Sequence, residues 1–244
     1  MINKGPILLL LFIFTCFNLY GQYNGDSIPR ETPNKRQTYL LPSILLISGI
    51  LVNNSQFEKT INRVIREKVG DNYSVPLDDY TQYAPIALLG LANIAGIRAK
   101  NHWFDQTKYF LISNAIVSAV THGLKRTVNK TRPNGEAYSF PSGHTSFAFT
   151  NAMVLYKEYQ YTSPILAYSG FAFSGTTATF RMLNNKHWLS DVLAGAGIAM
   201  LVTQLVYHFE PLKNFNPFMK QDKISIIPQA GRNQKIGLLL SIQL

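Results

Sequence analysis

The chain is organised around residues 125–191, which open with KRTVNKTRP (125–133), continue with PSGH (141–144) and close with RMLNNKHWLSD (181–191). Two imidazoles, a carboxylate and three cationic side chains stand out in these blocks: His144, His187, Asp191, Lys125, Arg132 and Arg181. A phosphoryl group in transfer carries charge on its equatorial oxygens, so its catalysis rests on positioning and on cationic or N–H stabilisation. Lys and Arg supply that charge, and the planar fork of Arg can bind two oxygens. The blocks therefore indicate phosphoryl transfer.

The spacing of His187 and Asp191 supports this interpretation. The two residues stand four apart, so on a helix they share one face. A carboxylate in that position can hold one imidazole N–H, fix the tautomer and leave the other ring nitrogen free as a nucleophile.

The block Ser142-Gly143-His144 follows a proline and opens an apolar run, which is typical of a helix start with Ser142 near the N-cap. Free backbone N–H groups at a helix start bind anions, and Gly143 lets a phosphate come close. His144 would lie beside that site, where it can give a proton to a leaving oxygen.

Taken together, the three blocks resemble the signature of the type-2 phosphatidic acid phosphatase and vanadium haloperoxidase superfamily. The matching positions are a Lys, an Arg-Pro, a Pro-Ser-Gly-His and an Arg…His…Asp. The chain departs from the family at Phe180, where a Ser usually precedes the Arg of the third block. This replacement removes one expected hydrogen bond to a phosphate oxygen.

The resemblance implies a role for each matching residue. It implies His187 as the nucleophile that forms a phosphohistidine, Asp191 as its orienting partner and His144 as the general acid. The phosphate ligands that it implies are Lys125, Arg132, Ser142, Gly143 and Arg181. No metal or other cofactor is expected for the phosphatases, while the haloperoxidase branch binds vanadate in the same pocket, so vanadate could occupy the phosphate site.

Six apolar segments predict the fold class. They lie near residues 39–53, 83–98, 108–124, 143–158, 163–179 and 189–208. No strand-like alternation interrupts them, so we expect an all-α six-helix bundle over residues 39–212. The tail at 213–244 differs: residues 223–227 and 235–244 read as two strands of a hairpin. The single cysteine, Cys16, excludes disulfides within the chain.

Residues 55–69 predict a further, amphipathic helix with Ser55 and Glu58 at capping-box spacing. Phe57, Ile61, Val64 and Ile65 make one face, while Lys59, Arg63 and Arg66 make the other. Such a helix either covers the core in the ordinary way or lies on a membrane surface.

The start of the chain reads as a secretory signal over residues 1–21, with Lys4, an apolar core and a plausible cleavage site at Gly21. A polar, irregular lead-in follows over residues 22–38. A lipoprotein signal at Cys16 is the alternative. The apolar segments are short or marginal for spanning a membrane. We therefore expect an enzyme of a bacterial-type cell envelope, membrane-associated, with its active site facing the periplasm.

The formal net charge of +10 favours anionic partners. We expect a phosphorylated lipid and a membrane surface rather than nucleic acid, because the basic residues are scattered and no nucleic-acid-binding motif appears. A soluble-substrate acid phosphatase, a vanadate-dependent haloperoxidase and a non-catalytic envelope scaffold are the rival readings.

Other polar residues near the motifs are assigned structural roles. His122 is interpreted as a structural helix residue, and Asp78 and Asp79 as caps of the helix that begins near Tyr83. Lys130 and Lys186 would raise the local positive potential without touching phosphate.

Overall fold

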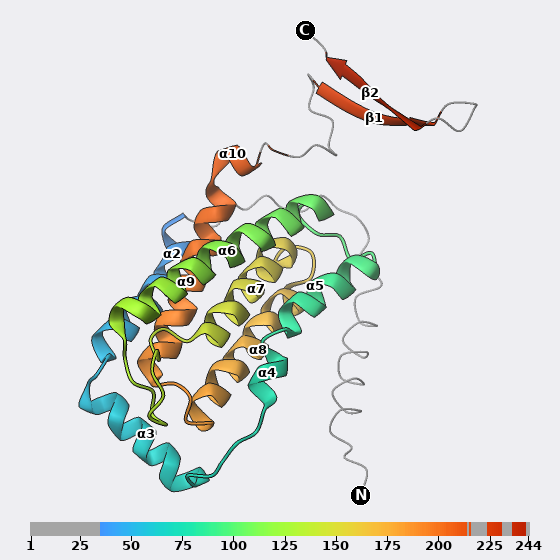
Figure 1. Cartoon of the computed structure of the whole chain (residues 1–244). Coiled ribbons are helices and arrows are strands. Elements are labelled where there is room, and N and C mark those ends of the chain that lie inside the picture. The colour runs from blue at the N-terminus through green and yellow to red at the C-terminus, as the bar shows by residue number, and fades with distance from the viewer. Residues whose placement is uncertain (1–34, 214, 216–223, 231–235, 243–244) are drawn as a thin grey trace, which may run out of the picture. The chain divides into compact units, whose positions relative to one another are not determined.

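The computed structural model describes residues 35–213, 215, 224–230 and 236–242 (Figure 1). Its helices are α2 (Lys35–Val52), α3 (Gln56–Val69), α4 (Leu77–Thr81), α5 (Ala84–Ile94), α6 (Trp103–Val128), α7 (Gly143–Tyr159), α8 (Pro164–Leu183), α9 (Leu189–His208) and α10 (Glu210–Lys213). All six predicted apolar helices form, as α2 and α5 to α9, which confirms the all-α class. The predicted signal peptide and residues 22–34 lie outside the described residues.

Helix α7 lies at the centre of the bundle, where it packs against α5, α6, α8 and α9 (Figure 1). Small residues allow this close packing: Ala148 and Ala152 are completely buried, and a Cβ on Gly170 would lie 3.1 Å from the Cα of Ala152. Because α7 is fixed on several sides, its N-terminal turn, which carries the PSGH block, is held in a defined place.

Helix α9 is held in the same way by α2. A Cβ on Gly197 would lie 2.5 Å from the backbone nitrogen of Leu46, and one on Gly49 would lie 2.6 Å from that of Ala194. No side chain fits at either position without moving one helix. This contact fixes the N-terminus of α9, which carries Asp191.

The structure differs from several of the predicted helix boundaries and caps. Helix α2 begins at Lys35, so the last residues of the predicted irregular lead-in are helical. Helix α6 runs on to Val128 and ends at Asn129, whose φ of 44° lies in the left-handed region. Asp78 and Asp79 do not cap the helix near Tyr83; they lie inside α4, a short helix of their own.

Helix α3 docks with its predicted apolar face only partly covered, because Ile61 and Ile65 are half-buried. Its inward contacts include polar ones: Glu58 reaches Lys130, Asn62 donates to Asn185 over 3.1 Å, and Arg66 donates to the carbonyls of Met182 and Leu183. The apolar Phe57 and Val64 remain 58% and 41% exposed. Hydrogen bonds to the loops of the bundle therefore help to set the orientation of this helix, and part of its apolar face stays exposed.

The backbone of the tail forms the predicted hairpin, with β1 (Ile224–Ala230) antiparallel to β2 (Ile236–Ile242). Ile224 pairs with Ile242, and Ala230 pairs with Ile236. Strand β1 runs on through Pro228 to Ala230, beyond the predicted strand end at residue 227. Each strand of a two-stranded ribbon has a free edge, where the missing N–H of a proline is tolerated.

Among the described helices, α9 alone is both long and apolar enough to cross a membrane, and 72% of its apolar window is buried inside the bundle. Residues 38–52 and 56–69 would qualify together as a broken span bent by 90°.

Candidate active site

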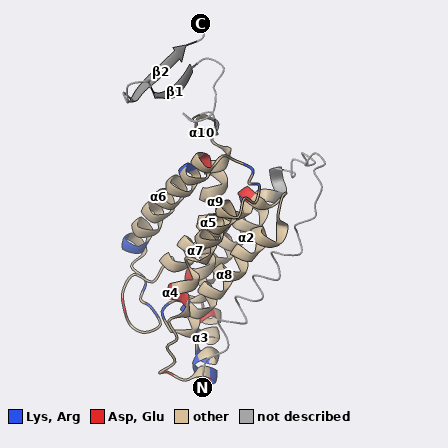
Figure 2. Cartoon of the chain, turned by 90° about the vertical axis from the view of Figure 1, so that its right-hand side faces the viewer, with Lys and Arg blue, Asp and Glu red and all other residues tan. Residues whose placement is uncertain are grey.

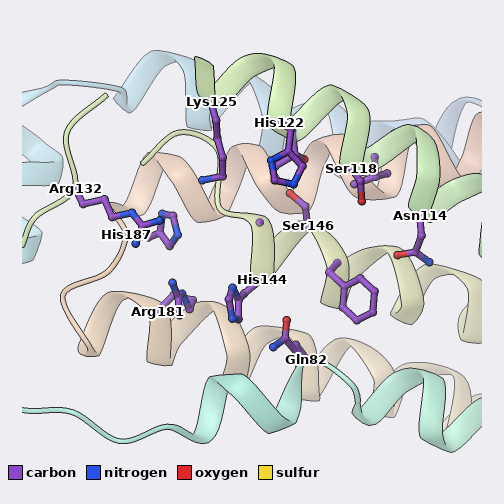
Figure 3. Close-up of a pocket in the computed structure, with 14 residues that line it drawn as sticks. Gln82, Asn114, Ser118, His122, Lys125, Arg132, His144, Ser146, Arg181 and His187 are labelled. Atoms are coloured by element: carbon purple, nitrogen blue, oxygen red, sulfur yellow. The ribbon is translucent and has the colours of Figure 1, made fainter. Parts of the chain in front are cut away.

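A cavity of about 410 Å³ opens between the helices at the end where the three motif blocks meet. Six predicted site residues line it together: Lys125, Arg132, Gly143, His144, Arg181 and His187 (Figure 3). They come from α6, the loop after it, α7, α8 and the loop before α9. The fold thus brings together side chains that are up to 62 residues apart in sequence, from Lys125 to His187.

His187 and Asp191 form the predicted pair. The Nδ1–H of His187 donates to Oδ2 of Asp191 over 3.2 Å, and both residues are almost fully buried. A carboxylate can only accept here, so the proton sits on Nδ1 and Nε2 keeps a free lone pair. Burial, aided by the charges of Arg181 and Lys125 and opposed by Asp191, lowers the pKa of His187 to about 4. The imidazole is therefore neutral at pH 7, as a nucleophile requires.

Asp191 lies behind His187 and is not on the cavity wall. Its Oδ2 also accepts from the backbone N–H of Trp188 over 2.8 Å and from the hydroxyl of Ser139. Its Oδ1 lies 3.3 Å from Nζ of Lys130, as an ion pair. The three hydrogen bonds to Oδ2 and the ion pair at Oδ1 hold the carboxylate toward the histidine, although Oδ1 itself accepts no hydrogen bond among the described residues.

The three cations of the site are each held by a polar contact, a backbone carbonyl for Lys125 and a carboxylate for each arginine, that leaves donors for a ligand. Nζ of Lys125 donates to the carbonyl of Tyr138 over 2.7 Å, Arg132 pairs with Glu136 at 2.6 Å, and Arg181 pairs with Asp78 at 2.8 Å. Burial and the neighbouring Arg132 lower the pKa of Lys125 to about 8. The Nε atoms of Arg132 and Arg181 are buried and have no acceptor among the described residues. Such unpaired donors are costly unless an anion accepts from them.

The N-terminal turn of α7 adds backbone donors, as predicted. Ser142 is its N-cap and accepts from the N–H of Thr145 over 3.5 Å. Ser142 is fully buried and is not on the cavity wall, so the structure gives it the role of shaping the turn. Gly143 does line the cavity, and a ligand can approach its backbone. Phe180, the departure from the family pattern, is also absent from the wall.

His144 lies opposite His187, and its Nε2–H donates to Oδ1 of Asp79 over 3.1 Å. Burial lowers the pKa of His144 and Arg181 lowers it further, while Asp79 raises it. Asp79 therefore keeps the imidazole more readily protonated than its buried position alone would allow.

Sequence reasoning missed the acidic pair of α4. Asp78 is 2% exposed and holds Arg181 and Asn184, whereas Asp79 is exposed and holds His144. Two acids directly preceding an apolar helix read as caps, and no local pattern distinguishes a cap from a distant ion pair. His122, interpreted above as structural, lies on the cavity wall.

Replacing Asp79 by Asn should shift the alkaline limb of the pH–rate profile to lower pH. If His144 gives its proton to the leaving oxygen, activity falls as pH rises through the pKa of His144, and loss of Asp79 lowers that pKa. The pair is half-exposed, so we expect a shift of less than about one pH unit. kcat/KM measured across pH tests this, with Asp71→Asn as an exposed acid outside the site. A shift to higher pH would contradict the assignment.

In the part of the chain that the structure describes, no group of three or more His, Cys, Asp or Glu side chains is arranged to hold a metal ion.

The fold and site define a helical bundle with a cavity lined by three cationic side chains and backed by a buried histidine–aspartate pair. Residues 106–215 match the model of the PAP2 superfamily, whose signature the three motif blocks resemble. A curated relative, the lipid A 1-phosphatase of Porphyromonas gingivalis, is 32% identical over 155 residues, or 62% of this chain. The chain spans only 34% of the length of that relative.

Two solved structures also match parts of this chain. LpxE of Aquifex aeolicus shares 20% identity over 65% of this chain and 99% of its own, with a TM-score of 0.49. The transmembrane PAP2-type phosphatidylglycerolphosphate phosphatase of Bacillus subtilis shares 15% identity over 89% of this chain and 100% of its own, with a TM-score of 0.40.

Proposed function

We propose that the protein is a phosphatase that hydrolyses a phosphate monoester or diphosphate of a membrane lipid through a phosphohistidine on His187. The observation that carries the proposal is the meeting of two features in one cavity. One is a neutral, buried imidazole whose Nδ1 is held by Asp191, and the other is the pair of unpartnered guanidinium Nε–H donors of Arg132 and Arg181. A tetrahedral phosphate would present phosphorus to Nε2 of His187 and oxygens to the two Nε–H donors.

In the first step, Nε2 of His187 forms a bond to phosphorus while the bond to the leaving oxygen breaks. The bonding electrons go to that oxygen, which takes a proton from His144. The developing positive charge on the imidazole is stabilised by Asp191. Water then attacks phosphorus and His144 accepts its proton. The N–P bond breaks with its electrons returning to Nε2, and inorganic phosphate leaves.

Charge stabilisation is assigned to Lys125, Arg132 and Arg181. Glu136, the partner of Arg132, is 53% exposed and can swing away when phosphate arrives. Asp78 is buried behind Arg181 and stays in place, so it orients the guanidinium while Nε faces the ligand. These residues supply the positive charge in this mechanism without a metal ion; vanadate, a phosphate analogue, would occupy the same pocket.

Two features support a lipid substrate. The outer surface of the bundle exposes large apolar side chains on several helices, among them Leu40, Ile44, Ile47 and Leu51 on α2. Figure 2 shows no charged residue along the middle of α2, α6 and α8. Exposed apolar area of this extent marks a partner surface, here the membrane. The cavity extends from the phosphate site along α6, where Asn114, Ser118 and Thr121 offer polar contacts to a headgroup (Figure 3).

Phosphate release by the purified protein from a panel of lipid and soluble phosphates tests the proposal. We expect a higher kcat/KM for lipid phosphates of the phosphatidate, lipid A or polyprenyl type than for small esters, because remote lipid contacts add binding that a soluble ester lacks. Faster turnover of soluble esters would favour the acid-phosphatase alternative. Bromide oxidation in the presence of vanadate would favour the haloperoxidase alternative. A protein without activity on any of these substrates would favour the non-catalytic envelope scaffold.

The same substrate prediction can be tested on α3. Its exposed Lys59 and Arg63 flank the outward apolar side chains, and each basic residue near an anionic surface contributes about 1 kcal/mol. Changing both to Gln should reduce activity on anionic vesicles more than on a soluble chromogenic ester, and raised salt should have the same effect. Arg66→Gln is the contrasting variant, because Arg66 binds backbone carbonyls and its loss should affect both substrates. Equal losses with the Lys59/Arg63 variant would show that this face does not bind membrane.

We also propose that the protein is exported and that its active site faces the periplasm. The support is the charged start and short apolar core of residues 1–21, which precede the bundle. N-terminal sequencing of protein from membranes and periplasm should give a mature chain beginning near Gln22. An intact Met1 would contradict cleavage of the signal.

A further inference from the structure

A second buried ion pair lies directly behind the His187–Asp191 pair. Lys130, in the loop after α6, is 7% exposed, and Glu58, on α3, is 1% exposed. Nζ of Lys130 lies 2.9 Å from Oε1 of Glu58, 2.7 Å from Oγ of Ser190 and 3.3 Å from Oδ1 of Asp191. The hydroxyl of Ser190 in turn donates to Oε2 of Glu58 over 2.5 Å. A continuous polar chain thus leads from α3 to the catalytic carboxylate.

Neither Lys130 nor Glu58 lines the cavity, and the contact of this ion pair with the site residues is the one between Lys130 and Asp191. Trp188 also contacts both Lys130 and Asp191. Lys130 lies 5.5 Å from the centre of the Trp188 ring, and the backbone N–H of Trp188 donates to Asp191. The charged groups that face Asp191 are His187, Lys130 and, further away, Lys125 and Glu58.

The charges along this network of polar contacts predict the sign of the effect that each substitution has on the His187–Asp191 pair. Glu58 and Asp191 are both carboxylates taken out of water, and Lys130 is the cation between them. If the cation were lost, two buried negative charges would remain and one of them would take up a proton. If Glu58 were neutralised instead, Asp191 would be the one remaining carboxylate paired with Lys130, and its ionised form would be favoured. The two changes should therefore act on the His187–Asp191 pair with opposite signs.

We infer that Lys130 and Glu58 are positioning residues that set the proton affinity and orientation of the His187–Asp191 pair. This inference rests on the proposed phosphohistidine mechanism. Lys130 holds Asp191 ionised and turned toward Nδ1 of His187, and Glu58 holds Lys130 in place from α3. The pair titrates as a unit, so the acid limb of the pH–rate profile reports it.

The test compares Lys130→Met, Glu58→Gln and Lys130→Arg. For Lys130→Met we expect kcat to fall about 10- to 100-fold, the size usual for residues that orient a catalytic ligand, with KM little changed. Removing the cation raises the proton affinity of the pair, so the acid limb moves to higher pH. Glu58→Gln lowers that affinity, so the limb moves to lower pH. Lys130→Arg keeps the charge and should restore most of kcat.

Lys108→Met provides a matched control. Lys108 is also a buried lysine in an ion pair, with its Nζ 2.6 Å from Oδ1 of Asp105. It does not line the cavity, and it does not belong to the network of polar contacts between Glu58 and Asp191. Breaking either pair costs stability. Only the Lys130 variant should shift the acid limb, whereas equal or absent shifts in the two lysine variants would overturn the inference.

A readout independent of turnover separates this inference from the proposed function. Imidazole ¹⁵N NMR should show the Nδ1–H tautomer of His187 in the wild type and its loss or weakening in Lys130→Met. An unchanged tautomer in an active enzyme would overturn the role of Lys130. A changed tautomer in a protein without phosphatase activity would support that role while rejecting the proposed function.

Discussion

Replacing His187 by Ala is expected to abolish both turnover and the covalent intermediate. The neutral ring of His187, whose Nδ1 is held by Asp191, is the group assigned to attack phosphorus, and alanine leaves nothing in its place. Acid-labile, alkali-stable phosphate bound to the protein should be found in the wild type and be absent from this variant. Turnover at the wild-type level in His187→Ala would end the proposed mechanism.

His144→Ala is the contrasting variant. Loss of a general acid typically costs about 10² to 10⁴ in rate. This loss depends on how much the leaving group needs a proton, so an activated ester should still form the phosphohistidine while a simple alkyl phosphate reacts slowly. Trapped phosphoenzyme in His144→Ala, but not in His187→Ala, would separate the roles of the two histidines. Equal trapping in both would show that neither is the nucleophile.

Asp191→Asn is expected to lower kcat by about 10³- to 10⁴-fold, as the corresponding change does in other histidine–aspartate pairs. The amide removes the negative charge that stabilises the imidazolium. If its NH₂ faces Nδ1 of His187, it also forces the ring proton onto Nε2, the atom that must attack. Rapid-quench measurement of phosphoenzyme formation tests the chemical step directly.

Ser139→Ala is the control for Asp191→Asn. Ser139 donates to the same Oδ2 of Asp191, yet the carboxylate keeps its charge and its bonds to His187 and Trp188 when this hydroxyl is lost. A loss of about one hydrogen bond, on the order of 1 kcal/mol, corresponds to less than about a tenfold change in rate. If Ser139→Ala and Asp191→Asn had similar effects, packing around the carboxylate rather than its charge would be responsible.

The sequence by itself predicted the six apolar helices, because their periodicity and length are local properties. It also predicted that Lys125, Arg132, Gly143, His144, Arg181 and His187 would form one site, through the spacing of three motif blocks. The structure brings these residues to one cavity. The start of α7 at Ser142 could be read in the same way, since an N-cap has a chemical signature that neighbouring residues carry.

Only the tertiary structure decided how the site is supported. Asp78 and Arg181 are 103 residues apart, Asp79 and His144 are 65 apart, and Glu58 and Lys130 are 72 apart. An ion pair formed over such separations leaves no periodicity in the chain, so each partner resembles a cap or a surface charge. The orientation of α3 was hidden for the same reason. Its polar side chains gain partners in loops far along the sequence, and those contacts help to determine which side turns inward.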